Sequence, residues 1–162
     1  MDGSKADQDL WALVVAAEQQ MARARADFYR NAGSRQDVLA AALRGSTWER
    51  GAALAFLRSL PDDVVPLLGQ LVDVSMSVKW ASAAKRAIAG GNPAAVRPAV
   101  RRLVEERLPA ADADDWRRLV ELLDFLGDRE GVRELVAQAA TNGDPEIREV
   151  GEDFSEGSEG SV

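Results

Sequence analysis

Apolar residues recur along this chain at intervals of three and four positions, which is the spacing of one face of an α-helix. The first such stripe lies in residues 7–30 and comprises Leu10, Leu13, Val14, Ala17, Met21, Ala24 and Phe28. A shorter apolar stripe over residues 35–44 stops before Gly45. No segment alternates apolar and polar residues over the length of a β-strand. The pattern therefore predicts an all-α fold.

From residue 46 onward, helix-start and helix-stop signals follow one another at short intervals. Ser46, Asn92 and Asp128 each precede an apolar stripe, and their side chains suit the N-cap of a helix. Proline at a first turn costs little because its missing N–H has no helical partner there. We therefore expect one helix to begin at Pro61 and continue through residue 72. The signals together predict about eight or nine helices joined by short turns.

Tryptophan marks similar places in successive helix pairs. Trp48, Trp80 and Trp116 are spaced 32 and 36 residues apart, and Ile147 follows Trp116 by 31 residues. A period of this length, with two helices in each unit, is typical of a helical repeat protein. Each unit hides only part of its apolar surface, so neighbouring units must stack. We expect the tryptophans to fill the space between the stacked layers.

Two segments carry a resemblance to HEAT-type repeats. The stretch Asp144-Pro145-Glu146-Ile147-Arg148 resembles the Asp-Pro-x-Val-Arg start of such a repeat. Residues 73–88 are similar to the looser pattern of an acidic residue, a Val-Arg-like pair and then small residues. The resemblance covers residues 46–154. It implies a short right-handed α-solenoid of antiparallel helix pairs.

The same rhythm suggests how the chain is divided. We expect a single helical-repeat domain over residues 1–154, with a capping helix pair at 7–45 and three helix-pair repeats at 46–143. Residues 144–154 would form a C-terminal capping helix, whose Ile147, Val150 and Phe154 pack against residues 132–139. The remaining residues, 155–162, are rich in Glu, Gly and Ser, so we expect a flexible acidic tail.

The composition narrows the possible chemistry. The 162 residues include no Cys and no His, which excludes disulfides, Cys/His zinc sites and histidine-based triads. Acid–base chemistry would fall to a carboxylate, Lys or Tyr, and we expect a protein that is not an enzyme and needs no cofactor. Asp112, Asp114 and Asp115 are clustered, but acidic residues at a helix N-terminus are favoured by the helix dipole. We therefore expect no metal site there.

Charge is unevenly distributed along the chain. The net charge is −7, yet residues 74–104 carry +6 and residues 105–162 carry −11. The candidate protein-binding residues are the cations Lys85, Arg86, Arg97, Arg101 and Arg102. Nucleic acid is a poor match, because the pI is about 4.7 and no aromatic residues are interleaved with these cations. We expect a protein partner and no membrane association.

Three functions are compatible with these features. The first is a small scaffold or adaptor that binds a protein through its helix faces and turns. The second is a bacterial immunity-type protein that occludes a cationic toxin, which the acidity and small size suit. The third is a relative of the HEAT-like DNA glycosylases, which would need Trp80 or Trp116 exposed beside a carboxylate.

The expected location follows from the N-terminus and the composition. The N-terminus, Met1-Asp2-Gly3-Ser4-Lys5, lacks the basic start followed by an apolar h-region that marks a signal peptide, so we expect no secretion signal and a cytoplasmic protein. Arginine outnumbers lysine by 17 to 3, which suggests a GC-rich bacterial genome.

Overall fold

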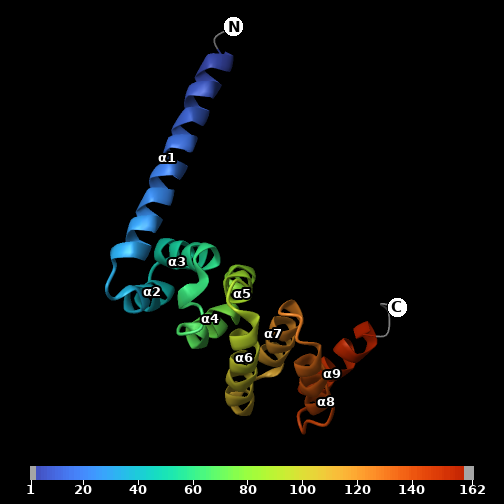
Figure 1. The fold of residues 1–162 in the computed structure, drawn as a ribbon. Helices are drawn as coiled ribbons and strands as arrows, with labels where there is room; N and C mark the ends of the chain where they lie inside the picture. Colours follow the sequence, from blue (N-terminus) through green and yellow to red (C-terminus); the bar gives the residue numbers. More distant parts are fainter. Residues whose placement is uncertain (1–2, 159–162) are drawn as a thin grey trace. The chain divides into compact units, whose positions relative to one another are not determined.

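The computed structural model describes residues 3–158, and most of them are helical (Figure 1). Within this range there are nine α-helices and no β-strand, so the predicted all-α class is confirmed. The α-helices are α1 (Gly3–Asn31), α2 (Arg35–Arg44), α3 (Thr47–Ser59), α4 (Leu68–Ser75), α5 (Ala81–Ala89), α6 (Pro93–Arg107), α7 (Ala113–Phe125), α8 (Arg129–Ala140) and α9 (Pro145–Ser158). Two short 3-10 helices, η1 (Pro61–Asp63) and η2 (Leu108–Ala110), complete the set.

The chain divides within α2, after Leu39, into two compact units. The first unit contains α1 and the start of α2. In this unit Arg35 lies over the ring of Tyr29, 4.7 Å from the centroid, and donates from Nη1 to the Tyr29 carbonyl oxygen at 2.8 Å. Along α1, every described side chain from residue 4 to residue 24 is exposed.

The second unit, residues 40–162, contains most of the hydrophobic core. Neighbouring helices pack in the order of the chain, as α4 does with α5, α7 with α8 and α8 with α9. Alternate helices also meet, as α3 does with α5, α4 with α6 and α7 with α9. The fully buried side chains along this unit include Leu57, Leu71, Ile88, Val100, Leu119, Val120 and Val150.

Side-chain caps fix several helix starts where the sequence predicts them. Ser46 and Glu49 form a capping box, in which the Glu49 backbone N–H donates to Ser46 Oγ and the Ser46 N–H donates to Glu49 Oε2. Asn92 accepts from the Ala94 N–H at 3.0 Å. Because these bonds satisfy backbone donors that have no helical partner, they define where α3 and α6 begin.

The prediction that a regular helix begins at Pro61 is wrong. Residues 61–63 form only η1, and the regular helix α4 begins at Leu68. Pro66 explains the difference, because proline lacks the N–H for a helical bond and disfavours helical geometry in the residue before it. The chain therefore passes residues 64–67 as turns.

The expected tryptophan layers are only partly present. Trp116 is buried, with 4% of its surface exposed, and Trp80 is half-buried. Trp48 is 89% exposed, so its predicted core role is wrong. It precedes the buried Ala53 by five residues, which turns its side chain about 140° away from Ala53 around α3.

The C-terminal helix packs as the sequence predicts. Ile147 and Val150 are buried, Phe154 is half-buried, and α9 packs against α8. Helix α9 continues to Ser158, four residues beyond the predicted end of the capping helix. The flexible tail predicted for residues 155–162 thus begins inside α9, and its residues 159–162 lie outside the described range.

Candidate functional site

The turn between α7 and α8 (residues 126–128) is built around a glycine with a left-handed backbone. Gly127 has φ of 66°, a conformation that side-chain-bearing residues rarely adopt. The Gly127 N–H donates to the Asp124 carbonyl oxygen at 2.9 Å, and the Asp128 N–H donates to that of Leu123 at 3.0 Å. These bonds end α7 tightly and place Asp128 at the N-cap of α8.

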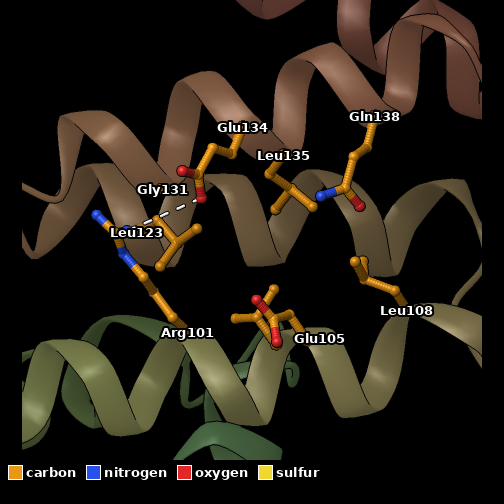
Figure 2. Close-up of a pocket in the computed structure, with 9 residues that line it drawn as sticks. Arg101, Glu105, Leu108, Leu123, Gly131, Glu134, Leu135 and Gln138 are labelled. Carbon is orange, nitrogen blue, oxygen red and sulfur yellow. Dashed lines mark ion pairs between the residues drawn. The ribbon is translucent and has the colours of Figure 1, made fainter.

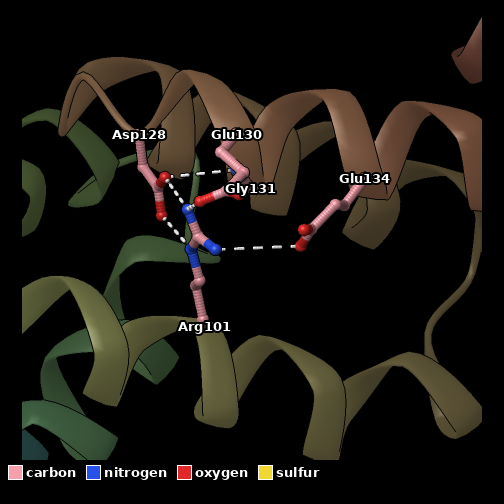
Figure 3. Close-up of polar contacts among 5 residues, drawn as sticks. All are labelled: Arg101, Asp128, Glu130, Gly131 and Glu134. Atoms are coloured by element: carbon pink, nitrogen blue, oxygen red, sulfur yellow. Dashed lines mark hydrogen bonds and ion pairs between the residues drawn. The ribbon is translucent and has the colours of Figure 1, made fainter.

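Asp128 joins this turn to the middle of α6 (Figure 3). Arg101 Nε donates to Asp128 Oδ2 at 2.6 Å, and Arg101 Nη2 donates to both Asp128 Oδ1 and Glu130 Oε2, the latter at 3.0 Å. Asp128 Oδ1 also accepts the Gly131 N–H at 3.1 Å, which caps α8. A two-pronged contact between guanidinium and carboxylate is both strong and directional. Asp128 therefore fixes the position of α8 on α6.

The contact between Arg101 and Asp128 shifts the pKa of both groups. The Arg101 guanidinium holds the pKa of the Asp128 carboxyl below its usual value, although burial acts in the opposite direction. The Gly131 N–H and the charge of Arg97 lower the same pKa further. Hydrogen bonds to Asp128 and Glu130 raise the pKa of Arg101. Both groups are thus charged near neutral pH.

Two of the five predicted protein-binding cations form ion pairs within the chain. Arg101 pairs with Asp128 and Glu130, and its Nη1 lies 3.8 Å from Glu134 Oε2. Lys85 Nζ lies 3.1 Å from Glu121 Oε2 and so connects α5 to α7. Both side chains therefore have an intramolecular role, which their charge alone does not indicate.

The other three predicted cations are exposed. Arg86 donates from Nη2 to Ser82 Oγ at 2.8 Å, one turn earlier on α5. Arg97 lies beside the α7–α8 turn, since a methyl group added at Gly127 would be 3.6 Å from Arg97 Nη2. Arg102 follows Arg101 on α6. Of the five predicted cations, Arg97 alone lines the surface feature described next, a hollow beside the α7–α8 turn.

That feature is a hollow of about 210 Å³, here called the Phe125 hollow. It is lined by Ile88, Ala89, Gly91, Pro93, Val96, Arg97, Phe125 and Leu126. The Phe125 side chain is 48% exposed. The arrangement combines apolar walls and an accessible aromatic ring with one guanidinium. Such a surface can bind an apolar side chain that has a carboxylate beside it.

Reasoning from the sequence missed Phe125. The stripe of α7 runs through Trp116, Leu119, Val120 and Leu123 at steps of three and four, so Phe125 falls off its line. A large aromatic residue outside the stripe, two positions before a helix-ending glycine, is the signal that could have found it. Aromatic residues are enriched in protein interfaces relative to other surface.

A second hollow lies between α6 and α8, and Figure 2 shows Arg101 and Glu134 on its opposite sides. Leu108, Leu123 and Leu135 lie among its lining residues. Its volume of about 20 Å³ has room for roughly one water molecule. It is therefore a packing gap beside the Arg101 contact and too small for an organic ligand.

A third hollow of about 410 Å³ is lined by α4, α6, η2 and α7 and carries three acidic residues, Asp73, Glu106 and Asp115. Its single cation, Arg107, donates to Asp73 Oδ1 at 2.5 Å and to the Gly69 carbonyl oxygen at 3.0 Å. Because Arg107 is engaged by Asp73, the two other carboxylates dominate the charge of this hollow.

The acidic cluster at the start of α7 has a structural explanation. Asp112 Oδ1 accepts the Asp115 N–H at 2.8 Å and so caps the helix, while Asp114 lies 3.6 Å from Arg117. Among residues 3–158, no group of three His, Cys, Asp or Glu side chains is placed to hold a metal ion.

The two tryptophans of the glycosylase hypothesis, Trp80 and Trp116, differ in exposure. Trp116 is in the core. Trp80 is half-buried, and its ring is approached by Lys79 Nζ at 5.3 Å and by the Arg50 guanidinium at 5.9 Å. Two cations over an indole form cation–π contacts.

Within residues 3–158, none of the helices combines the length and the apolar character needed to cross a lipid bilayer. Comparison of the chain with protein-family models, with curated proteins and with solved structures finds no significant match.

Proposed function

We propose that residues 40–162 form a non-enzymatic protein-binding module and that a partner docks at the Phe125 hollow. The observation that carries this proposal is the exposed ring of Phe125 beside an apolar hollow that also includes Arg97. Burying accessible apolar surface favours association, and aromatic and arginine side chains contribute much of the energy in protein interfaces.

The partner's chemistry follows from the hollow. An aliphatic or aromatic side chain would enter between Phe125 and Pro93, and a neighbouring Asp or Glu would pair with Arg97. Gly127 fixes the adjacent backbone, and Asp128 holds the turn on α6 through Arg101. The site is therefore pre-organised, which lowers the entropic cost of binding.

A peptide library displayed on phage and selected on the intact protein tests the proposal. We expect enrichment of peptides that place Asp or Glu next to an apolar residue. Phe125→Ala and Arg97→Ala should each weaken binding of the selected peptides about tenfold or more, as for a loss of about 1.4 kcal/mol. Arg133→Ala, a matched exposed arginine on α8, should leave binding unchanged. Peptides that ignore both substitutions would overturn the assignment.

The third hollow, which carries Asp73, Glu106 and Asp115, favours an alternative function, that of an immunity-type protein. Its surplus carboxylates suit a cationic partner, as the occlusion of a basic toxin requires. The same selection distinguishes the two functions. Enrichment of Lys- and Arg-rich peptides whose binding is lost in Glu106→Lys and kept in Phe125→Ala would favour the immunity-type function.

We also propose that α3 to α8 are the three helix pairs of a HEAT-like solenoid and that α9 is its C-terminal cap, with the domain boundaries expected from the sequence. The packing of α3 with α5, of α4 with α6 and of α7 with α9 supports this, because stacked repeats bring alternate helices together. An experimental structure of residues 40–158 would test the handedness and stacking of the pairs. Helix pairs that cross without stacking would contradict it.

A further inference from the structure

Helix α1 carries large apolar side chains that are exposed. Leu10 is 62% exposed, Val14 48% and Met21 45%. Trp11 and Leu13 beside them are 66% and 67% exposed. An amphipathic helix normally buries its apolar face, so these side chains indicate a binding surface.

The spacing of this face specifies the shape of what covers it. Leu10, Val14, Ala17, Met21 and Ala24, here called the α1 stripe, follow one another at steps of four, three, four and three. Steps that average 3.5 residues keep a stripe aligned with a single partner helix in a coiled coil. The small Ala17 and Ala24 would let that helix approach closely.

The charges of α1 specify the partner and its direction. Residues 3–18 carry Lys5, Asp7, Asp9 and Glu18, a net charge of −2, and residues 19–31 carry Arg23, Arg25, Asp27 and Arg30, a net charge of +2. The helix dipole does not explain this division, because its effect is confined to the first and last turns. We propose that the α1 stripe binds the α1 stripe of a second copy of this chain, in antiparallel orientation.

Antiparallel pairing places each acidic half against the basic half of the other copy. Parallel pairing would instead oppose halves of the same sign. A two-fold symmetric contact of this kind uses one surface twice and closes at the dimer. A membrane surface is a poorer match, since anionic headgroups would repel the acidic half, which contains Leu10 and Val14.

The mass of the intact protein in solution tests the pairing. By sedimentation equilibrium at micromolar concentration we expect a species of twice 17.5 kDa. Val14→Glu should shift this species toward the monomer. Ala12→Glu adds the same charge two residues away, on the side of α1 away from the stripe, and should leave the dimer in place. A wild-type protein that stays monomeric throughout overturns the proposal.

Charge reversal tests the complementarity. Arg23→Glu with Arg25→Glu makes both halves of α1 acidic, and Asp7→Lys with Asp9→Lys makes both halves basic. Each double variant alone should dimerise more weakly than the wild type, and mixing the two should restore a dimer. Mixing that restores nothing, or variants as dimeric as the wild type, contradicts the assignment.

Spin labels test the direction. The chain contains no cysteine, so labels at Ser4→Cys and Ala26→Cys are unique. These positions are about 33 Å apart along one helix. Antiparallel copies bring residue 4 of one chain nearer to residue 26 of the other than to residue 4. The reverse order of distances indicates parallel copies and overturns the proposed orientation. Binding of monomers to phosphatidylserine vesicles, with loss of the dimer, overturns the proposed partner.

Discussion

Asp128 connects three parts of the second unit through one carboxylate. It accepts from Arg101 on α6, caps α8 through the Gly131 N–H, and follows the left-handed Gly127. Only 5% of the residue is exposed. Burying a carboxylate costs free energy unless its oxygens accept hydrogen bonds. The burial of Asp128 therefore depends on its hydrogen bonds from Arg101 and from the Gly131 N–H.

Asp128→Asn separates the ionic part of this role from the capping part. Asparagine caps a helix about as well as aspartate, so the Gly131 contact can remain while the charge pairing with Arg101 is lost. We expect the free energy of unfolding at pH 7 to fall by about 1.5–3 kcal/mol, the range for hydrogen bonds to charged groups. Urea unfolding measures this change.

The difference between wild type and Asp128→Asn should depend on pH with a definite sign. The pKa of Asp128 is lowered in the folded protein from an ordinary value of 3.8. Its ionic contribution is therefore complete above pH 3.8 and is lost as the pH falls through the folded-state pKa. The two proteins should converge in acid. A difference that stays constant as the pH falls well below 3.8, through the folded-state pKa, would contradict the role assigned to the charge.

At the scale of elements, α9 approaches the backbone of α8 closely at Gly151. A methyl group added there would lie 2.7 Å from the Ala140 nitrogen and 3.1 Å from the Val136 carbonyl oxygen. Both neighbours are backbone atoms of α8, which cannot move aside as the end of a side chain can. Gly151 thus lets α9 pack against α8 and bury Ile147 and Val150.

Gly151→Ala should lower the free energy of unfolding by about 1–3 kcal/mol, because overpacking outweighs the better helix propensity of alanine. Gly69→Ala is the matched control, since Gly69 is also helical and nothing lies within 4 Å of an added methyl group. It should leave stability unchanged or raise it by up to about 1 kcal/mol. Chemical denaturation of both variants checks the contrast, and equal effects would refute it.

Local signals in the sequence predicted the elements better than they predicted tertiary positions. The caps at Ser46 and Asn92 and the end of α7 at Gly127 are set by short-range bonds, so their residues identify them. The Trp spacing predicts a buried Trp48, but the direction of this side chain around α3 leaves it exposed. Arg101 was expected to face a partner because its bond to Asp128, 27 residues away, depends on how α6 meets α8.

The candidate site shows the same limit. Arg97 was among the predicted residues, and the structure places it in the Phe125 hollow. The hollow itself is formed by residues of α5, α6 and α7 and by the turn after α7, so no single segment encodes it. A methyl group added at Gly131 would lie 2.8 Å from Asp128 Oδ2. The need for glycine at this position likewise becomes visible only in the folded turn.

At the scale of the molecule, the burial pattern of α1 differs from that of the second unit. The fully buried side chains of that unit begin at Leu43 and extend to Val150. Large apolar residues of α1, by contrast, are exposed. Tolerance to truncation follows from the burial of the residues removed rather than from their position at a terminus. The two ends of this chain should therefore respond differently to shortening.

A chain shortened to residues 34–162 should retain cooperative unfolding, with a free energy of unfolding within about 1 kcal/mol of the intact protein, since it loses few buried groups. A chain shortened to residues 1–144 should be far less stable, because it loses the buried Ile147 and Val150. Circular dichroism in urea measures both. If residues 34–162 alone fail to unfold cooperatively, α1 contributes to the core of the second unit, and its exposed stripe cannot be reserved for a second copy.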